Sequence, residues 1–252
     1  MKKTEVVKER EIKVWAHRGA SGYAPENTLE AFKQAMKMGA DGVELDIQMT
    51  RDGELVVIHD ETIDRVSGES GWVKDWTLSE LKKLNVSKHM KGYEKRTRIP
   101  TLEEVLEILK NTEMTINIEL KNSIVPYTGM EERLMWLLSE YDMNDRIWCS
   151  SFNHESILRV KQLMPEMKCG LLFCDVIVNA AQYAAELGVE AVHPAVYHMA
   201  DSQYIRKAHH EGLAVHVWTA NSKEDMKLLI DREADAIITN YPDLALEMLK
   251  RS

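Results

Sequence analysis

We place the working centre of this chain in residues 42–60, which read GVELDIQMTRDGELVVIHD. Two β-rich runs flank an Asp-Gly pair at residues 52 and 53, which is a strong signal for a β-hairpin. Glu44 and Asp46 are two residues apart in the first run, so both carboxylates leave the same face of the strand. Because their apolar neighbours indicate burial, and a bare buried charge is costly, we expect positive partners for these carboxylates.

The turn predicts which residues of the hairpin face one another. If Asp52 and Gly53 are its two central residues, counting outward along the strands pairs Asp46 with His59. Directly opposed residues on antiparallel strands share a face, with about 5 Å between their Cβ atoms. A turn of odd length would instead shift the register by one residue and send His59 to the other face. An ordinary surface hairpin is the alternative, and the apolar run at 56–58 disfavours it.

The overall composition is that of a globular protein: of 252 residues, 44% are apolar and 29% are charged. The net charge of −9 argues against nucleic acid or an anionic membrane as partner. No uncharged run approaches the ~20 residues that cross a bilayer, and residues 1–10 lack the apolar core of a secretory signal. Cys149, Cys169 and Cys174 form no CxxC pair, so we expect a reducing cytoplasm and three buried thiols. The sequence leaves homo-oligomer formation open.

Outside the hairpin, strands and helices alternate along the chain. The predicted strands are centred near residues 15, 45, 118, 148, 170, 191, 216 and 237. Eight such units in roughly 250 residues predict an α/β fold with a closed (β/α)8 TIM barrel. A doubly wound open sheet is the rival, but it usually carries a glycine-rich phosphate loop, and the sequence has neither GxGxxG nor GxxxxGK.

One segment, residues 60–98, interrupts the alternation after the second strand and its hairpin. It is irregular and contains several glycines and aromatic residues, and it is either a lid or a packed excursion. We therefore expect one barrel domain over residues 1–252, with 60–98 as a small inserted subdomain near the site. Capping boxes at 77–80 and 101–104, and Asn27 with Glu30, predict three helix starts.

In a TIM barrel, the chemistry lies at the C-terminal ends of the strands. The polar and aromatic residues predicted there are His17 and Arg18, Glu44 and Asp46, Glu119 and Lys121, and His216 and Trp218. Three carboxylates without a partnering cysteine or an HExxH helix predict a hard divalent cation, Mg²⁺ or Ca²⁺, rather than zinc. Together, the three carboxylates, the divalent cation and the basic side chains of Arg18 and Lys121 carry a net charge of +1, which suits a phosphodiester anion. His17 and His59 are then candidates for general base and acid, because imidazole titrates near neutral pH.

Some of these residues have plain structural interpretations. In one alternative, Glu119 and Lys121 form an ion pair on an edge of the sheet. The apolar neighbours at 116, 118 and 120 disfavour it, because they indicate a buried strand. In a second alternative, His17 is a hydrogen-bonded histidine of the core and has no catalytic role.

The aromatic residues near the end of the chain are also ambiguous. Trp218 is a candidate apolar wall for a substrate's carbon chain, with core packing as a nearly equal alternative. For His216, core packing is favoured. The remaining histidines, including His209 and His210, are expected to be solvated.

Several short motifs recur in a fixed order along nearly the whole chain. They are HRG (17–19), PENT (25–28), ELD (44–46), HD (59–60) followed by Thr62, Asp64-Arg65 and Gly68, ELK (119–121), WT (218–219) and TNYP (239–242). Any one of these is weak, but the ordered set resembles the glycerophosphodiester phosphodiesterase family.

The resemblance implies a phospholipase C-like barrel that hydrolyses glycerophosphodiesters, such as glycerophosphocholine or glycerophosphoethanolamine, to sn-glycerol 3-phosphate and an alcohol. By matching motif positions, it implies three sets of site residues: metal ligands Glu44, Asp46 and Glu119, an acid–base pair His17 and His59, and phosphate contacts Arg18 and Lys121.

Two other functions stay open. In the first, the same barrel acts on a lysophospholipid or an inositol phospholipid, which the acidic net charge disfavours. In the second, a non-catalytic barrel binds a phosphorylated metabolite around a structural cation. Two titrating histidines facing a metal disfavour this reading, because binding alone does not need them.

Overall fold

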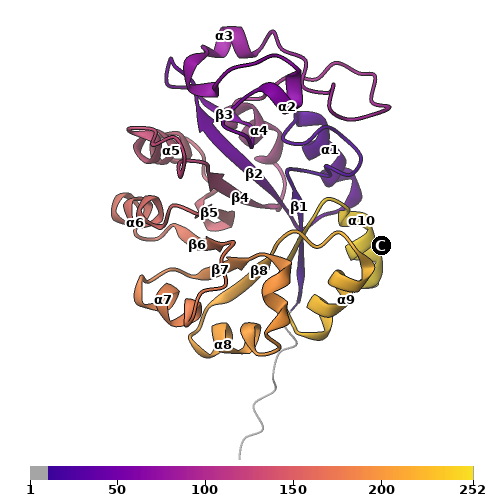
Figure 1. Ribbon diagram of the computed structural model, residues 1–252, viewed down its shortest axis with the longest axis vertical. Helices are drawn as coiled ribbons and strands as arrows, with labels where there is room; N and C mark the ends of the chain where they lie inside the picture. The colour runs from indigo at the N-terminus through magenta and orange to yellow at the C-terminus, as the bar shows by residue number, and fades with distance from the viewer. Residues whose placement is uncertain (1–10, 252) are drawn as a thin grey trace, which may run out of the picture.

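The computed structural model describes residues 11–251, which form a closed barrel of eight parallel strands inside a ring of helices (Figure 1). Neighbouring strands follow the order β1-β9-β8-β7-β6-β5-β4-β2, and pairing of β1 with β2 closes the barrel. The predicted (β/α)8 barrel is therefore confirmed. The expectation that residues 1–10 are not a secretory signal lies outside the described residues.

Residues 11–251 contain nine strands, which include all eight that the sequence predicts. They are β1 (Lys13–His17), β2 (Gly42–Met49), β3 (Leu55–Val57), β4 (Thr115–Leu120), β5 (Ile147–Ser151), β6 (Lys168–Phe173), β7 (Ala191–Pro194), β8 (Ala214–Val217) and β9 (Ala236–Thr239). The additional strand, β3, pairs antiparallel with β2.

The helices cover the outer face of the barrel or lie in the connections. They are α1 (Leu29–Met38), α2 (Asp64–Ser67), α3 (Leu78–Leu81), α4 (Leu102–Leu109), α5 (Met130–Ser139), α6 (His154–Leu163), α7 (Ala180–Glu186), α8 (Tyr204–His210), α9 (Lys223–Asp231) and α10 (Pro242–Met248). Short 3-10 turns lie at Val73–Asp75, Asn144–Arg146 and Val196–Ala200. Among the described residues, we find no helix with both the length and the apolar character needed to span a bilayer.

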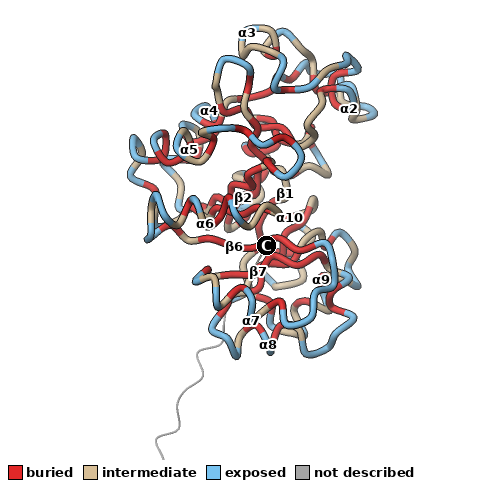
Figure 2. The backbone as a smooth tube through the Cα atoms, turned by 60° about the vertical axis from the view of Figure 1, so that its left-hand side comes forward, coloured by how far each residue is buried: buried red, intermediate tan, exposed pale blue. Residues whose placement is uncertain are grey.

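The main core lies between the strands and the helix ring. Figure 2 shows that the strands consist mostly of buried residues. Strand residues at alternating positions point outward into it, as Val43, Leu45 and Ile47 do on β2. The intervening positions, Glu44 and Asp46, therefore point into the barrel. This alternation explains how β2 carries an apolar outer face and an acidic inner face.

The predicted start of α1 is wrong by one residue. Thr28, not Asn27, is the N-cap, and its Oγ1 accepts a hydrogen bond from the backbone N–H of Ala31. Asn27 has a left-handed backbone, with φ of 55°, and its side chain turns toward β2 instead. The two capping boxes, Thr77 with Glu80 and Thr101 with Glu104, are confirmed.

The predicted hairpin register is also wrong by one residue. Met49 pairs with Leu55, so the turn has an odd number of residues, and Ile58 rather than His59 lies opposite Asp46. Two bonds of Thr50 build this longer turn: its Oγ1 accepts from Glu54 N at 2.9 Å and donates to Asp52 at 2.7 Å. β3 ends at Val57, and the chain bends at residues 59 and 60. The alternation of side chains between the two faces of the strand therefore does not determine the direction of the His59 side chain.

The segment 60–98 is ordered and packed. It lies beyond β3, with α2 and α3, at the top of Figure 1. Its apolar side chains form a second core with hairpin and neighbouring residues: Val56, Ile58, Ile63, Val66, Val73, Leu81, Val86 and Ile99. The apolar side chains of this segment therefore pack against the hairpin.

Two further sequence expectations are corrected. His193 and His198 are buried rather than solvated, because His193 lies on the inner face of β7 and His198 bonds backbone carbonyls after β6 and β7. Cys174 is exposed because it follows the last residue of β6, whereas Cys149 and Cys169 are buried. His216 packs in the core, as favoured, with its Nδ1 2.8 Å from His193 Nε2.

Gly42 is required by the close approach of β2 to β4. A Cβ at this position would lie 2.7 Å from the carbonyl oxygen of Thr115 and 2.8 Å from the Trp15 ring. Gly42→Ala is therefore expected to lower the free energy of unfolding by about 1–3 kcal/mol, because one strand must shift. Urea unfolding followed by circular dichroism measures this, and an unchanged midpoint would contradict the packing described here.

Candidate active site

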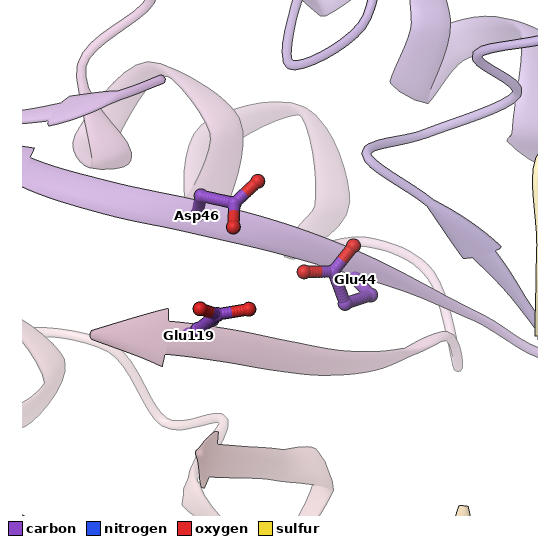
Figure 3. Close-up of side chains that lie close together, drawn as sticks. All are labelled: Glu44, Asp46 and Glu119. Carbon is purple, nitrogen blue, oxygen red and sulfur yellow. The ribbon is translucent and has the colours of Figure 1, made fainter. Parts of the chain in front are cut away.

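The three predicted carboxylates meet inside the barrel mouth (Figure 3). Asp46 on β2 is the register partner of Glu119 on β4, and Glu44 lies two residues earlier on the same face of β2. One oxygen from each of the three lies within 4.8 Å of the others, and all three side chains are buried. The parallel register thus brings together residues that are far apart in the sequence.

Two basic side chains neutralise part of this charge. The Arg18 backbone N–H donates to Glu44 at 2.9 Å, and its Nε forms an ion pair with Asp46 at 3.3 Å. Lys121 Nζ donates to Glu119 at 2.8 Å. The structure therefore supplies the positive partners that the sequence predicts, from the loop after β1 and the end of β4.

The three carboxyl groups of the acidic triad, Glu44, Asp46 and Glu119, differ in the direction of their pKa shifts. Burial acts to raise the pKa of Asp46, but Arg18 and other nearby positive groups lower it to about 2. Burial raises the pKa of Glu44 well above its ordinary value, and the charges of Asp46 and Glu119 raise it further. Burial also raises the pKa of Glu119, against the opposing charge of Lys121.

The donor set of the acidic triad fits a hard divalent cation. All of its donor atoms are carboxylate oxygens, the type of ligand that Mg²⁺ and Ca²⁺ take. Asp46 Oδ1 is buried and has no hydrogen-bond partner among the described residues, so one oxygen is left for a ligand. The triad can therefore hold a metal ion.

The two predicted histidines both reach this site, with different partners. His17 Nδ1 lies 2.7 Å from Asn240 Oδ1, and its Nε2 lies 3.9 Å from Glu44. Burial and the charge of Arg18 lower the pKa of His17 to about 4. The imidazole is therefore neutral near pH 7 in this environment.

His59 is held by a carboxylate instead of an amide. Its Nδ1 lies 2.6 Å from Asp60 Oδ1, and its Nε2 lies 3.3 Å from Lys121 Nζ. Its carbonyl oxygen accepts a hydrogen bond from Gln48 Nε2 at 2.9 Å. The bend after β3 thus brings His59 to the predicted place, although the register that predicted it was wrong.

The cavity at the barrel mouth has a charged side and an apolar side. The charged residues come from β1, β2, β4 and the bend after β3, and the apolar lining residues are Phe152, Leu172, Trp218 and Ile238. Trp218 donates from Nε1 to the His193 carbonyl at 2.7 Å, and its ring meets Phe152 edge to face. Trp218 therefore lines the cavity rather than serving only as core packing.

Sequence reasoning missed several polar residues of the site. Asn27 donates to Asp46 at 2.8 Å, and Asn240 contacts His17 at 2.7 Å. Both asparagines belong to the quoted motifs, but their local pattern is typical of a helix cap or a turn. His193 also lines the cavity, and its place on an inner strand face was the available signal.

Comparisons with known proteins agree with this geometry. Residues 17–244 match the Glycerophosphoryl diester phosphodiesterase family. The chain is 41% identical over 238 residues to a glycerophosphodiester phosphodiesterase of Caldanaerobacter subterraneus subsp. tengcongensis, covering 94% of this chain and 98% of that protein. It is 38% identical over 238 residues to a glycerophosphodiester phosphodiesterase of Bacillus altitudinis, covering 94% and 97% of the two chains.

A solved structure of an Oleispira antarctica phosphodiesterase, in complex with the product sn-glycerol-3-phosphate, has the same fold. It matches with a TM-score of 0.86 and 28% identity, over 94% of this chain and 96% of that chain. Together with the family match and the two relatives, this places the chain in the glycerophosphoryl diester phosphodiesterase family, as a phosphoric diester hydrolase.

Proposed function

We propose that this protein hydrolyses glycerophosphodiesters, such as glycerophosphocholine and glycerophosphoethanolamine, to sn-glycerol 3-phosphate and an alcohol, with Mg²⁺ or Ca²⁺ bound. The observation that carries the proposal is one cavity lined by two histidines, two carboxylates and a guanidinium: His17, His59, Glu44, Glu119 and Arg18. Asp46 and Lys121 contact this lining directly, through Arg18 and Glu119. The product bound to the Oleispira relative supports this choice of substrate. Family membership already excludes a purely non-catalytic barrel.

The acidic triad would hold the cation. When bound, the ion would lower the pKa of a coordinated hydroxyl and offset the negative charge that develops on the phosphoryl group. Asp46 and Glu119 form ion pairs with Arg18 and Lys121, which orient these two carboxylates at the charged side of the cavity.

His17 is assigned as the general base. Its Nδ1 donates to the amide oxygen of Asn240, which leaves the lone pair on Nε2 facing the cavity. That nitrogen takes a proton from the attacking hydroxyl, either the glycerol 2-hydroxyl or water, while the new P–O bond forms. The neutral partner of Nδ1 favours the uncharged imidazole that a base requires.

His59 is assigned as the general acid. Its Nδ1 donates to the Asp60 carboxylate at 2.6 Å, which fixes the orientation of the ring and leaves Nε2 for the substrate. As the bond between phosphorus and the leaving oxygen breaks, the electron pair goes to that oxygen, and His59 Nε2 supplies its proton. The two histidines exchange roles if the attack first gives a cyclic phosphate that water then opens.

The other site residues bind the two ends of the substrate. Arg18 and Lys121 would place positive charge beside the phosphoryl oxygens, a stabilisation that is often the largest catalytic contribution. Trp218 would form an apolar wall for the carbon atoms of the substrate, beside Phe152.

Lys121→Ala tests the phosphate contact. The variant is expected to lower kcat/KM at least about tenfold, because a buried charge facing the phosphoryl oxygens is lost. Steady-state kinetics with glycerophosphocholine measure the change. Lys161→Ala is the matched control, since Lys161 is similarly buried in an ion pair with Glu190, outside the site. An unchanged kcat/KM for Lys121→Ala would remove Lys121 from phosphate binding.

A coupled assay for glycerol 3-phosphate release tests the substrate class. We expect release of glycerol 3-phosphate from glycerophosphocholine and glycerophosphoethanolamine. Lysophosphatidylcholine and phosphatidylinositol keep their acyl chains when a phosphodiester bond is cleaved, so their turnover is followed by the release of the water-soluble head group, and it should be much slower. Faster turnover of either phospholipid would favour the alternative substrates on the same barrel. We also propose a cytoplasmic location, which the free thiols Cys149, Cys169 and Cys174 support.

A further inference from the structure

We propose that Arg65, in the inserted segment 60–98, is a positioning residue for His59, acting through Asp60. The inference rests on the proposed role of His59 as general acid. It gives the inserted segment a function in the reaction, beyond its own packing. Arg65 itself contacts neither the triad nor His59 in the described structure.

Arg65 bridges two carboxylates that come from different parts of the chain. Its Nε donates to Asp60 Oδ2 at 2.6 Å and its Nη2 to Asp60 Oδ1 at 3.1 Å. The same guanidinium donates to both oxygens of Glu26, at 2.8 and 2.7 Å. Two bidentate contacts from one guanidinium fix its position and orientation relative to both acids.

The Asp60 carboxylate passes this constraint to His59. Asp60 Oδ1 lies 2.6 Å from His59 Nδ1, so the oxygen held by Arg65 also fixes the imidazole and its tautomer. Hydrogen bonds from His59 and Arg65 hold the pKa of Asp60 well below its ordinary value. Asp60 therefore stays an acceptor, and His59 keeps its proton-bearing Nδ1 directed at it.

Glu26 anchors Arg65 to the barrel. Glu26 Oε1 accepts from Arg18 Nη1 at 3.0 Å, so the anchor belongs to the same network as the acidic triad. Although burial acts to raise the pKa of Glu26, Arg65 and Arg18 lower it to about 2. The hydrogen-bonded chain from Arg18 through Glu26, Arg65 and Asp60 thus ends at His59.

The geometry requires arginine in particular. Its planar fork contacts two carboxylates at once, whereas a lysine ammonium is a single point charge on a flexible stem. Arg65→Lys would keep the charge and lose the double bridge. Arg65→Met would lose both and keep much of the apolar stem.

A comparison of leaving groups distinguishes positioning of His59 from a structural role. Choline is a poor leaving group that needs protonation, whereas p-nitrophenolate leaves without it. Losing a positioned general acid should therefore lower kcat for glycerophosphocholine much more than for the p-nitrophenyl ester of sn-glycerol 3-phosphate. A variant whose fold or phosphate contacts are damaged should lose activity on both esters equally.

The experiment measures the kcat loss on each ester for Arg65→Met, Arg65→Lys, His59→Ala and a control, Arg51→Met. Arg51 forms an exposed ion pair with Glu80 and donates to the Asp75 carbonyl, and neither partner belongs to the network. We expect the loss on the choline ester to exceed that on the p-nitrophenyl ester about 10²-fold for His59→Ala and roughly tenfold for Arg65→Met. Arg65→Lys should fall between Arg65→Met and wild type, and Arg51→Met should show equal, small effects.

The outcomes separate the two claims. A large difference for His59→Ala with equal losses for Arg65→Met would overturn the role of Arg65 and leave the proposed function intact. Equal losses for His59→Ala would overturn the general-acid assignment, and the inference about Arg65 with it. Wild-type behaviour of Arg65→Lys would show that charge alone suffices and would contradict the bridging geometry. Activity on the p-nitrophenyl ester reports in each variant that the site is folded.

Discussion

Replacing either His17 or His59 with alanine is expected to lower kcat for glycerophosphocholine about 10²–10⁴-fold, because each variant removes one positioned proton-transfer group. Both imidazoles line the same cavity as Glu44 and Glu119 of the acidic triad, and each is oriented through its Nδ1. KM should change less than kcat, because proton transfer matters in the transition state rather than in binding.

Steady-state kinetics of the purified variants measure this effect. His210→Ala is a suitable control, since His210 is exposed on α8, outside the cavity. A variant of His17 or His59 whose kcat stays within a few fold of the wild-type value would remove that residue from the mechanism.

Replacing Glu119 with glutamine is expected to weaken binding of Mg²⁺ or Ca²⁺ roughly 10²-fold or more, with a parallel loss of activity. Glutamine keeps the size of the side chain and removes its charge, so the substitution tests the donor and not the packing. Glu44→Gln and Asp46→Asn should behave in the same way, because the triad offers one oxygen from each residue.

Isothermal titration calorimetry measures metal affinity without depending on turnover. Glu103→Gln, an exposed position on α4, is the control for a lost surface charge. Unchanged affinity in all three triad variants would show that the cation binds elsewhere or not at all.

The barrel could be predicted from the sequence because its signals are local. Each strand is a short apolar run, and helix starts such as Thr101 with Glu104 carry both partners of the capping box within four residues. The convergence of Glu44, Asp46 and Glu119 could also be predicted, since parallel strands present their C-terminal ends at the same face.

The hairpin register and the secondary partners of the site could not be predicted in this way. The register depends on side-chain bonds of Thr50 within the turn, which lengthen the loop without changing its Asp-Gly signature. The pattern around Asn27 is typical of a helix cap, yet its backbone has a positive φ and its side-chain amide donates to Asp46 on β2, the strand next to β1. A bend after β3 brings His59 to the site. The predicted position of His59 was therefore right, but the hairpin register from which it was predicted was wrong.

We propose that the barrel mouth hydrolyses glycerophosphodiesters with a divalent cation held by the acidic triad. The most direct measurement is the rate of sn-glycerol 3-phosphate release from glycerophosphocholine by the wild-type protein, before and after removal of metal with a chelator. We expect chelation to abolish release and added Mg²⁺ or Ca²⁺ to restore it. Full activity in excess chelator would rule out a required cation, and no glycerol 3-phosphate in the presence of either ion would rule out the proposed reaction.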